Sequence, residues 1–247
     1  MKLMQKVGLS PCKCPTPCEK LEVIMNPQFT EIAYILDRSG SMQPMQEPAV
    51  AAYNDFIKSQ LDVPGEARLT LVQFDDAYEV HVSAKRIQDV PQLTAATYTP
   101  RGSTALLDAI GRTIKEINER INAMTEAQRP GKVIVTIFTD GMENASREYT
   151  KSHITDLIAI HRAKGWEFLF LAANQDAIAS GTSMCMDASL SANVSFSFEG
   201  VRSTGKAMAR KVRSMRMKSG GIMDAQAMQD DAKSMNDIVK EEEAKPD

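Results

Sequence analysis

Three oxygen-bearing side chains stand close together directly after an apolar run near the start of the chain. Residues 33–36 are Ala, Tyr, Ile and Leu, and Asp37, Ser39 and Ser41 follow them at alternate positions. A carboxylate and two hydroxyls on one tight turn are hard oxygen donors of the kind that Mg²⁺ prefers, and Mg²⁺ also retains several of its waters. This turn therefore predicts part of a divalent-cation site whose other ligands come from elsewhere in the chain.

Two later segments offer such ligands. Thr104 lies where a loop meets a helical pattern, and Asp140 directly follows a second apolar run at residues 133–139. In open parallel sheets, ligands bind beyond the carboxyl ends of the strands. Asp37 and Asp140 each follow a strand of this kind, and the helix after Thr104 starts toward the same edge. The three segments are therefore expected to converge.

The pattern of apolar residues predicts the elements that position this site. Four nearly continuous apolar runs are typical of parallel strands covered on both faces, and they span residues 32–36, 69–74, 133–139 and 168–172. Residues 78–82 alternate instead, which favours an antiparallel edge strand. Helical spacing of apolar residues predicts helices over residues 50–61, 107–121 and 154–161. The fold class is therefore predicted as α/β, with a doubly wound, mostly parallel central sheet, one antiparallel edge strand and helices on both faces.

Three segments resemble, in this order, the metal-ion-dependent adhesion site of von Willebrand factor type A domains. They are Asp37-x-Ser39-x-Ser41, Thr104 and Asp140. The resemblance implies that the two serines and Thr104 bind the metal directly, while the two aspartates act largely through bound waters. It also implies Mg²⁺, with Mn²⁺ as a second possibility, and one coordination position open to an Asp or Glu of a partner protein. We expect Asp108, one turn further along the helix, to be a hydrogen-bond partner inside the protein.

The resemblance extends over roughly residues 30–200. Asn174-Gln175-Asp176 is similar to sequences at this position in bacterial and phage proteins of the family, and its Asn and Asp are expected to cap a short helix at the same edge. Intracellular prokaryotic relatives often act beside AAA+ ATPases of the MoxR type. The resemblance thus implies such an ATPase as a partner, although nothing in the sequence names one.

Composition indicates an ordinary globular protein. The 247 residues are 43% hydrophobic and 25% charged, enough for one α/β domain over residues 30–219 between a leader at 1–29 and an acidic, largely flexible tail at 220–247. The net charge of −3 disfavours general binding of nucleic acid. The sequence contains neither an apolar run long enough to span a membrane nor the apolar core of a secretory signal, so we expect a cytoplasmic protein. Its oligomeric state is not indicated.

The leader contains Cys12, Cys14 and Cys18 among several prolines. A structural zinc site needs four ligands, and no histidine is nearby to complete the set. Reduced thiols in a Pro-rich segment are the favoured interpretation, with an intermolecular metal or disulfide site as the alternative.

Two features of the last third of the sequence concern functions other than metal binding. Residues 200–207 match the G-x₄-G-K part of a phosphate-binding loop after a strand-like alternation at 194–198, but Ala207 stands where a Ser or Thr is needed, so nucleotide binding is disfavoured. Residues 202–218 carry a charge of +7, which predicts a final helix with a solvated basic face or a surface for an acidic partner. Residues 224–247 carry −5 and are expected to fold back on that helix or to dock on a partner.

Catalysis finds little support in the sequence. The serines lack the G-x-S-x-G pattern of hydrolases, and none of the three histidines is spaced to activate one. We therefore expect a Mg²⁺-dependent protein-binding module that is not an enzyme. A metal-dependent hydrolase and a structural subunit of a larger assembly are the alternatives.

Overall fold

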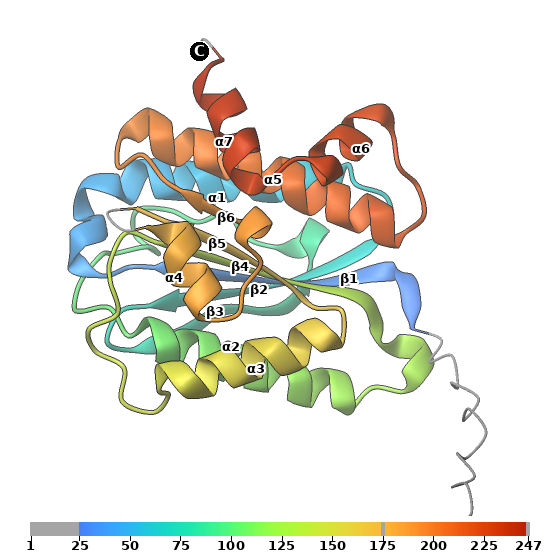
Figure 1. Ribbon diagram of the computed structural model, residues 1–247, viewed down its shortest axis with the longest axis horizontal. Coiled ribbons are helices and arrows are strands. Elements are labelled where there is room, and N and C mark those ends of the chain that lie inside the picture. The colour runs from blue at the N-terminus through green and yellow to red at the C-terminus, as the bar shows by residue number, and fades with distance from the viewer. Residues whose placement is uncertain (1–24, 174–175, 246–247) are drawn as a thin grey trace, which may run out of the picture.

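A six-stranded sheet forms the centre of the protein in a computed structural model that describes residues 25–173 and 176–245 (Figure 1). The strands lie side by side in the order β3-β2-β1-β4-β5-β6. They are β1 (Asn26–Asp37), β2 (Glu66–Phe74), β3 (Tyr78–Arg86), β4 (Pro130–Thr139), β5 (Glu167–Ala172) and β6 (Ser191–Asn193). Edge strand β3 is antiparallel to β2, and the other neighbours pair in parallel. The predicted fold class is confirmed.

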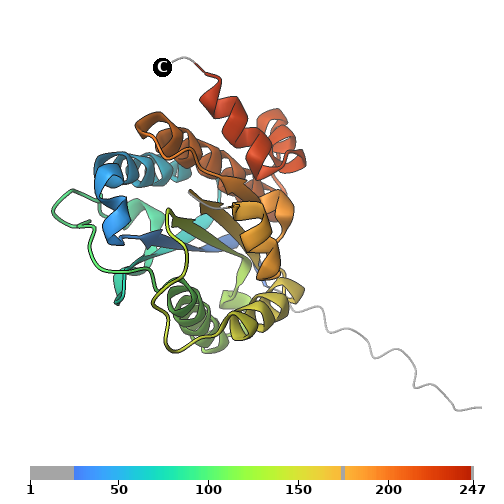
Figure 2. The ribbon, with the colours of Figure 1, turned by 60° about the vertical axis from the view of Figure 1, so that its left-hand side comes forward.

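Helices cover both faces of this sheet (Figure 2). The α-helices are α1 (Gln46–Leu61), α2 (Leu106–Asn122), α3 (Lys151–Ala163), α4 (Ala177–Ser183), α5 (Phe198–Ser219), α6 (Ala225–Ala232) and α7 (Met235–Glu243). Four short 3₁₀ helices are η1 (Gly40–Met45), η2 (Ile87–Asp89), η3 (Glu126–Gln128) and η4 (Ala188–Leu190). Helices α1, α5 and α7 lie on one face, and α2 and α3 lie on the other.

The central strands bury side chains on both faces, which explains their continuous apolar runs. Along β1, Ile32 and Tyr34 pack into the core under α1 and α5, whereas Ala33 and Ile35 pack into the core over α2 and α3. Each of these four side chains is at most 2% exposed. Both faces of β1 are thus buried up to its end at Asp37.

Strands β1 and β4 occupy the point where the order of the strands reverses. The chain passes from β1 through α1 to β2 on one side, whereas β4 lies on the other side of β1 and leads outward to β5 and β6. The connections therefore diverge to opposite faces at the carboxyl ends of β1 and β4, which leaves a crevice where open α/β sheets bind their ligands. Asp37 is the last residue of β1, and Asp140 directly follows β4.

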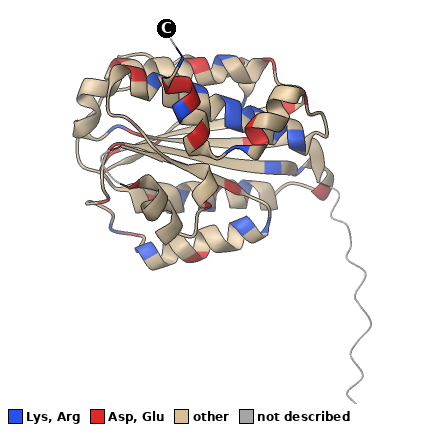
Figure 3. Ribbon diagram, turned by 45° about the horizontal axis from the view of Figure 1, so that its top comes forward, with Lys and Arg blue, Asp and Glu red and all other residues tan. Residues whose placement is uncertain are grey.

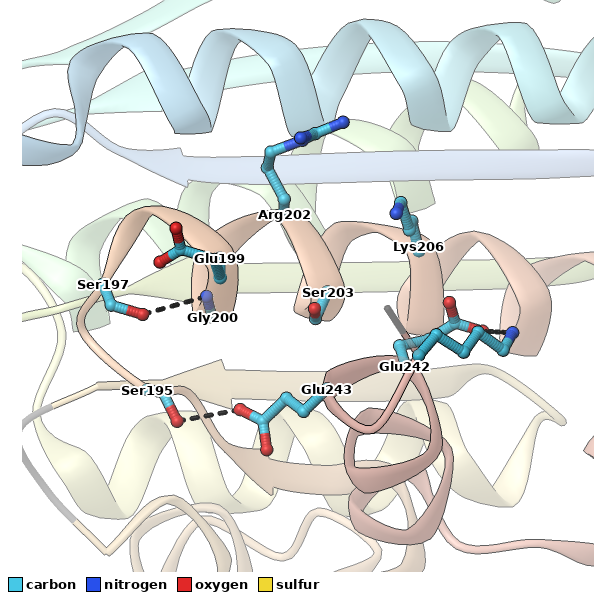
Figure 4. Close-up of a pocket in the computed structure, with 10 residues that line it drawn as sticks. Ser195, Ser197, Glu199, Gly200, Arg202, Ser203, Lys206, Glu242 and Glu243 are labelled. Atoms are coloured by element: carbon cyan, nitrogen blue, oxygen red, sulfur yellow. Dashed lines mark hydrogen bonds and ion pairs between the residues drawn. The ribbon is translucent and has the colours of Figure 1, made fainter. Parts of the chain in front are cut away.

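The segment before α5 differs from its predicted structure. The strand-like character expected at residues 194–198 is wrong, because the strand is shorter and earlier, and Ser197 is the N-cap of α5 with its Oγ accepting a hydrogen bond from Gly200 N at 3.0 Å. Residues 200–207 therefore lie within a helix. Figure 4 shows Gly200 and Lys206 on different turns of α5 rather than in a phosphate-binding loop.

The acidic segment after residue 220 was expected to be largely flexible and either to fold back on the preceding helix or to dock on a partner, and it folds back on α5 as α6 and α7. Met235, Ile238 and Val239 of α7 are buried in the core, and acidic and basic residues alternate where these helices meet (Figure 3). Arg210 of α5 is paired with three carboxylates of this segment, those of Asp230, Glu241 and Glu242. The solvated basic face predicted for α5 is thus largely covered.

Two further predictions concern membrane spans and the cysteines, and the structure describes them only in part. Within the described residues, none of the helices has both the length and the apolarity needed to cross a bilayer. Cys12, Cys14 and Cys18 lie outside the described residues, and the half-buried Cys185 has a free thiol.

Candidate metal centre

Three loops meet at the carboxyl ends of β1 and β4. The loop after β1 is joined to the loop before α2 by two backbone hydrogen bonds, from Gly40 N to Gly102 O at 3.1 Å and from Arg101 N to Arg38 O at 2.7 Å. The loop after β4 completes the group. These contacts bring together segments that are far apart in the sequence, as the topology predicted.

Asp37 is held rigidly at the base of this edge. Its side chain is fully buried, with Oδ1 accepting a hydrogen bond from Ser39 N at 2.7 Å and Oδ2 accepting one from Thr139 Oγ1 at 2.5 Å. The Tyr98 hydroxyl donates to the Asp37 backbone carbonyl at 2.5 Å. Asp37 therefore braces both its own loop and the end of β4.

The serine hydroxyls connect Asp37's loop to Asp140. Ser39 Oγ lies 3.1 Å from Ser41 Oγ, and Ser41 Oγ donates to Asp140 Oδ1 at 2.9 Å. Ser39 and Asp140 are almost fully buried, whereas Ser41 is exposed. The result is a row of neighbouring oxygen atoms with the exposed Ser41 in its middle.

Thr104 approaches the same place from the loop before α2. A Cβ atom added to Gly141 would lie 2.9 Å from Thr104 Oγ1, so the missing side chain of Gly141 makes room for this hydroxyl. The Thr104 backbone is fixed by Asn144, whose Oδ1 accepts from Thr104 N at 2.9 Å and whose N donates to Thr104 O at 3.0 Å. All five predicted site residues thus lie at one edge of the sheet, and their binding of a metal stays a prediction.

The two carboxyl groups experience an environment that disfavours their charge. The pKa of Asp37 is raised to about 6, mainly by burial and to a smaller extent by the nearby Asp140 carboxylate. The hydrogen bonds from Thr139 and Ser39 oppose this rise. Burial also raises the pKa of Asp140, opposed by the hydrogen bond from Ser41. Arg38, the basic residue next in sequence, is turned toward Asp75 instead, with its Nε 3.1 Å from Asp75 Oδ2. A bound cation would offset the cost of this buried negative charge.

The donor set at this edge is entirely oxygen and rich in hydroxyls. Over the part of the chain that the structure describes, no group of three or more His, Cys, Asp or Glu side chains is arranged to hold a metal. Structural zinc sites are built from such groups, whereas Mg²⁺ accepts neutral oxygen ligands and keeps waters. The residues present therefore fit a hard divalent cation.

The roles of several residues that shape this edge of the sheet were not predicted from the sequence. Thr139 and Tyr98 hold Asp37, and Glu143 caps α2, with its Oε2 accepting from Leu107 N at 2.9 Å. Thr104, which was expected to begin that helix, lies two residues before it. Glu143 follows Asp140 by three residues, in a loop expected to lie beside the start of the helix. An acidic residue at such a place could have been predicted to accept hydrogen bonds from the free N–H groups of the helix. Thr139 carried none, because threonine is common in buried strands.

Two predictions about neighbouring polar residues agree with the structure. Asp108 is an internal hydrogen-bond partner, and its carboxylate accepts from the backbone N–H groups of Arg147, Glu148 and Tyr149 at 2.8–2.9 Å. Asp176 caps α4, with its Oδ1 accepting from Ala179 N at 3.0 Å. Asn174 and Gln175 lie outside the described residues.

Comparison with known proteins finds one family. Residues 32–143, which include all five predicted site residues, match the family model of the von Willebrand factor type A domain. This part of the chain is therefore similar to von Willebrand factor type A domains. No curated protein sequence matches the chain.

Solved structures share the fold of this chain. Proximal thread matrix protein 1 from the mussel byssus has a TM-score of 0.52 and 15% identity over 75% of this chain and 46% of its own. The pilus adhesin SpaC of Lactobacillus rhamnosus GG has a TM-score of 0.57 and 13% identity over 75% of this chain and 31% of its own. A von Willebrand factor type A protein from Catenulispora acidiphila has a TM-score of 0.50 and 17% identity over 78% of this chain and 42% of its own. The chain spans less than half the length of each.

Proposed function

We propose that this protein is a binding module that recognises an acidic side chain of a partner protein through a bound divalent cation. One observation carries the proposal, namely the convergence of three loops that places two carboxyl groups and three hydroxyls at the carboxyl edge of β1 and β4. These groups belong to Asp37, Ser39, Ser41, Thr104 and Asp140.

The ligand roles follow the family resemblance. Ser39, Ser41 and Thr104 would hold the ion directly, and Asp37 and Asp140 would act largely through water. Such an ion supplies an electrophilic position that an incoming carboxylate can occupy. The chain's own residues do the rest, because Thr139 and Ser39 fix the Asp37 carboxylate and Asn144 fixes the loop that carries Thr104.

We propose Mg²⁺ as the resident ion, with Mn²⁺ as a substitute. A mussel structure of proximal thread matrix protein 1, with a TM-score of 0.52 and 17% identity, is described with zinc in its metal-ion-dependent adhesion site. The purely oxygen donor set of the present chain favours the harder ion. Parallel titrations with Mg²⁺, Mn²⁺ and Zn²⁺ test this choice.

For the partner, we propose a cytoplasmic protein with an exposed Asp or Glu, and we favour an AAA+ ATPase of the MoxR type, as in bacterial or phage relatives. We also propose that the domain itself has no hydrolase activity. The support for this is that the serines lack the G-x-S-x-G pattern of hydrolases and that no histidine is among the five site residues. Turnover of phosphate or carboxylate esters that requires Mg²⁺ and disappears in Asp140→Asn would overturn the second proposal.

The decisive experiment separates metal binding from partner binding. Calorimetric titration with Mg²⁺ should show one site in the wild type and strongly reduced binding in Asp37→Asn, whereas Asp76→Asn, which removes an exposed carboxylate from the loop after β2, should bind normally. Equal binding by the wild type and Asp37→Asn would refute the metal site.

In a second experiment, a purified MoxR-type ATPase should be captured with Mg²⁺, lost with EDTA, and lost with Thr104→Ala. The exposed Thr94→Ala serves as the control. Removing a buried charge-assisted contact typically costs about 2–5 kcal/mol, far more than losing a charge at the rim. Capture that survives both EDTA and Thr104→Ala would place the interface elsewhere on the protein.

A further inference from the structure

A cavity of about 300 Å³ lies at the amino ends of β4 and β5, the opposite edge of the sheet from the candidate metal centre. Its lining combines the C-terminal part of α2, the start of β4 and the turn between α3 and β5. Apolar side chains contribute most of this lining, notably Ile121, Val133 and Trp166. The Trp166 ring is 7% exposed and is supported from behind by His161, with ring centroids 4.5 Å apart. The tryptophan is thus held in a fixed position at the cavity.

Two cations accompany these apolar side chains. Arg129 and Lys164 line the cavity, and none of the lining residues is acidic. Within the described residues, Arg129 Nε is buried and has no hydrogen-bond partner. The ammonium of Lys164 makes one long contact, with Asn118 Oδ1 at 3.5 Å. Because neither cation is paired with a carboxylate among the described residues, the cavity carries positive charge that an anionic ligand would balance.

We propose that this cavity binds a small amphipathic carboxylate, with the apolar body against Trp166, Ile121 and Val133 and the carboxylate on Arg129 and Lys164. Arginine matches the planar carboxylate with two parallel N–H donors, and lysine adds a point charge. The volume lies at the lower end of the range for small-molecule sites, which fits a compact acid rather than a nucleotide. The apolar floor likewise argues against a bare inorganic anion.

The test uses Trp166, because it is the only tryptophan in the chain. The full-length protein is titrated with 4-phenylbutyrate, and the fluorescence of Trp166 is recorded. Two probes separate the parts of the ligand, since 4-phenyl-1-butanol retains the apolar body without the charge and acetate retains the carboxylate without the body. We expect a saturable change with 4-phenylbutyrate, affinity for the alcohol weaker by roughly tenfold or more, as expected for loss of a charge-assisted hydrogen bond, and no saturation with acetate.

Variants assign the effect to the cavity. Arg129→Gln should weaken 4-phenylbutyrate by roughly tenfold or more, and Arg129→Lys should lose less because the charge remains. Arg147→Gln is the matched control, since it removes an exposed arginine at the metal edge and should leave binding unchanged. Thermal unfolding of each variant checks that the fold persists, and amide shifts of Gly131 and Gly165 locate the ligand independently of the tryptophan signal. The proposal fails if 4-phenylbutyrate gives no saturable change, if Arg129→Gln binds as well as the wild type, or if the alcohol binds equally well.

Discussion

At the scale of single residues, the candidate metal centre depends on side chains that do not face the ion. Thr139 donates its hydroxyl proton to Asp37 Oδ2, and this bond stabilises the ionised form of a carboxyl group whose pKa is raised by burial. The same bond prevents rotation of the carboxylate. Residues that orient metal-binding groups commonly affect metal affinity almost as strongly as the ligands themselves.

The first prediction concerns this threonine. Thr139→Val keeps the shape of the side chain but removes the hydrogen bond, so the affinity for Mg²⁺ should fall by roughly 10–100-fold. Thr136→Val is a close control, because Thr136 is equally buried on β4 but its hydroxyl donates to Ala33 O at 3.1 Å, away from the site. Calorimetry on both variants decides, and equal losses of affinity in the two would assign the effect to strand packing.

His161 gives a prediction about pH. Burial lowers the pKa of this histidine below its ordinary value of 6.5, with Lys164 acting in the same direction and the hydrogen bond to Leu157 O opposing them. Below that value the unfolded chain binds the proton more readily than the folded protein does. The stability contributed by neutral His161 is therefore complete above about pH 6.5 and is lost as the pH falls through the folded-state pKa.

Asp37, whose pKa is raised to about 6, acts in the opposite direction over this interval, but it does so equally in the wild type and in His161→Gln. The wild type should therefore lose more unfolding free energy than His161→Gln, or gain less, as the pH falls from about 7 to 5. The exposed His153→Gln should retain the wild-type dependence. Urea unfolding followed by the emission of Trp166 measures all three proteins. Parallel profiles for the wild type and His161→Gln would contradict the prediction.

At the scale of elements, the start of α2 is satisfied by the loop that follows β4 rather than by its own N-cap. Glu143 accepts hydrogen bonds from Leu107 N, Ala145 N and Ser146 N, and Asp108 in the first turn accepts from three N–H groups of residues 147–149. The helix and the loop therefore position one another. This mutual capping fixes two of the three loops of the candidate metal centre.

Substitutions of Asp108 and Asp140 test whether the first residue stabilises the fold and the second binds the metal. Asp108→Asn replaces an oxygen acceptor with a donor facing backbone N–H groups, so stability should fall by about 1–3 kcal/mol while the affinity for Mg²⁺ is retained. Asp140→Asn should do the reverse and abolish metal binding with little loss of stability. Chemical denaturation and calorimetry on both variants provide the measurement. Loss of Mg²⁺ binding in a fully stable Asp108→Asn would give Asp108 a role at the metal.

These elements also show what the sequence could predict. Strands buried on both faces leave long apolar runs, so β1, β2, β4 and β5 were recognised, and the ends of β1 and β4 then brought Asp37 and Asp140 to one edge. Contacts between distant loops leave no such periodic signal, so Thr139, Glu143 and Asn144 were missed. The opposite charges of residues 202–218 and 224–247 indicated that the second segment could fold back on the first, but they did not reveal which pairs form, such as Arg210 with Asp230 and Arg213 with Asp224.

At the scale of the whole molecule, the cations of α5 join separate parts of the chain. Arg216 is buried and donates to Gln60 O at 2.8 Å and Val63 O at 3.3 Å, at the C-terminal end of α1. Lys211 donates to three backbone carbonyls at the end of α6, among them Lys233 O at 2.7 Å. Positive charge at these helix ends satisfies carbonyls that have no partner within their own helix. The basic helix is therefore an internal connector.

The last prediction tests whether this connection holds the C-terminal helices on the domain. Arg210 pairs with Asp230, which is 1% exposed, and with Glu242, whose side chain is 4% exposed. Arg210→Met leaves both carboxylates buried without this partner and should lower the unfolding free energy by about 3–5 kcal/mol. Lys218→Met breaks a pair whose lysine is 64% exposed and should cost less than about 1 kcal/mol. Chemical denaturation gives both values, and hydrogen exchange then shows whether the protection lost in Arg210→Met is concentrated in α6 and α7. Similar small losses in the two variants would mean that apolar packing of Met235, Ile238 and Val239 alone holds these helices in place, and that the charges on α5 serve another purpose.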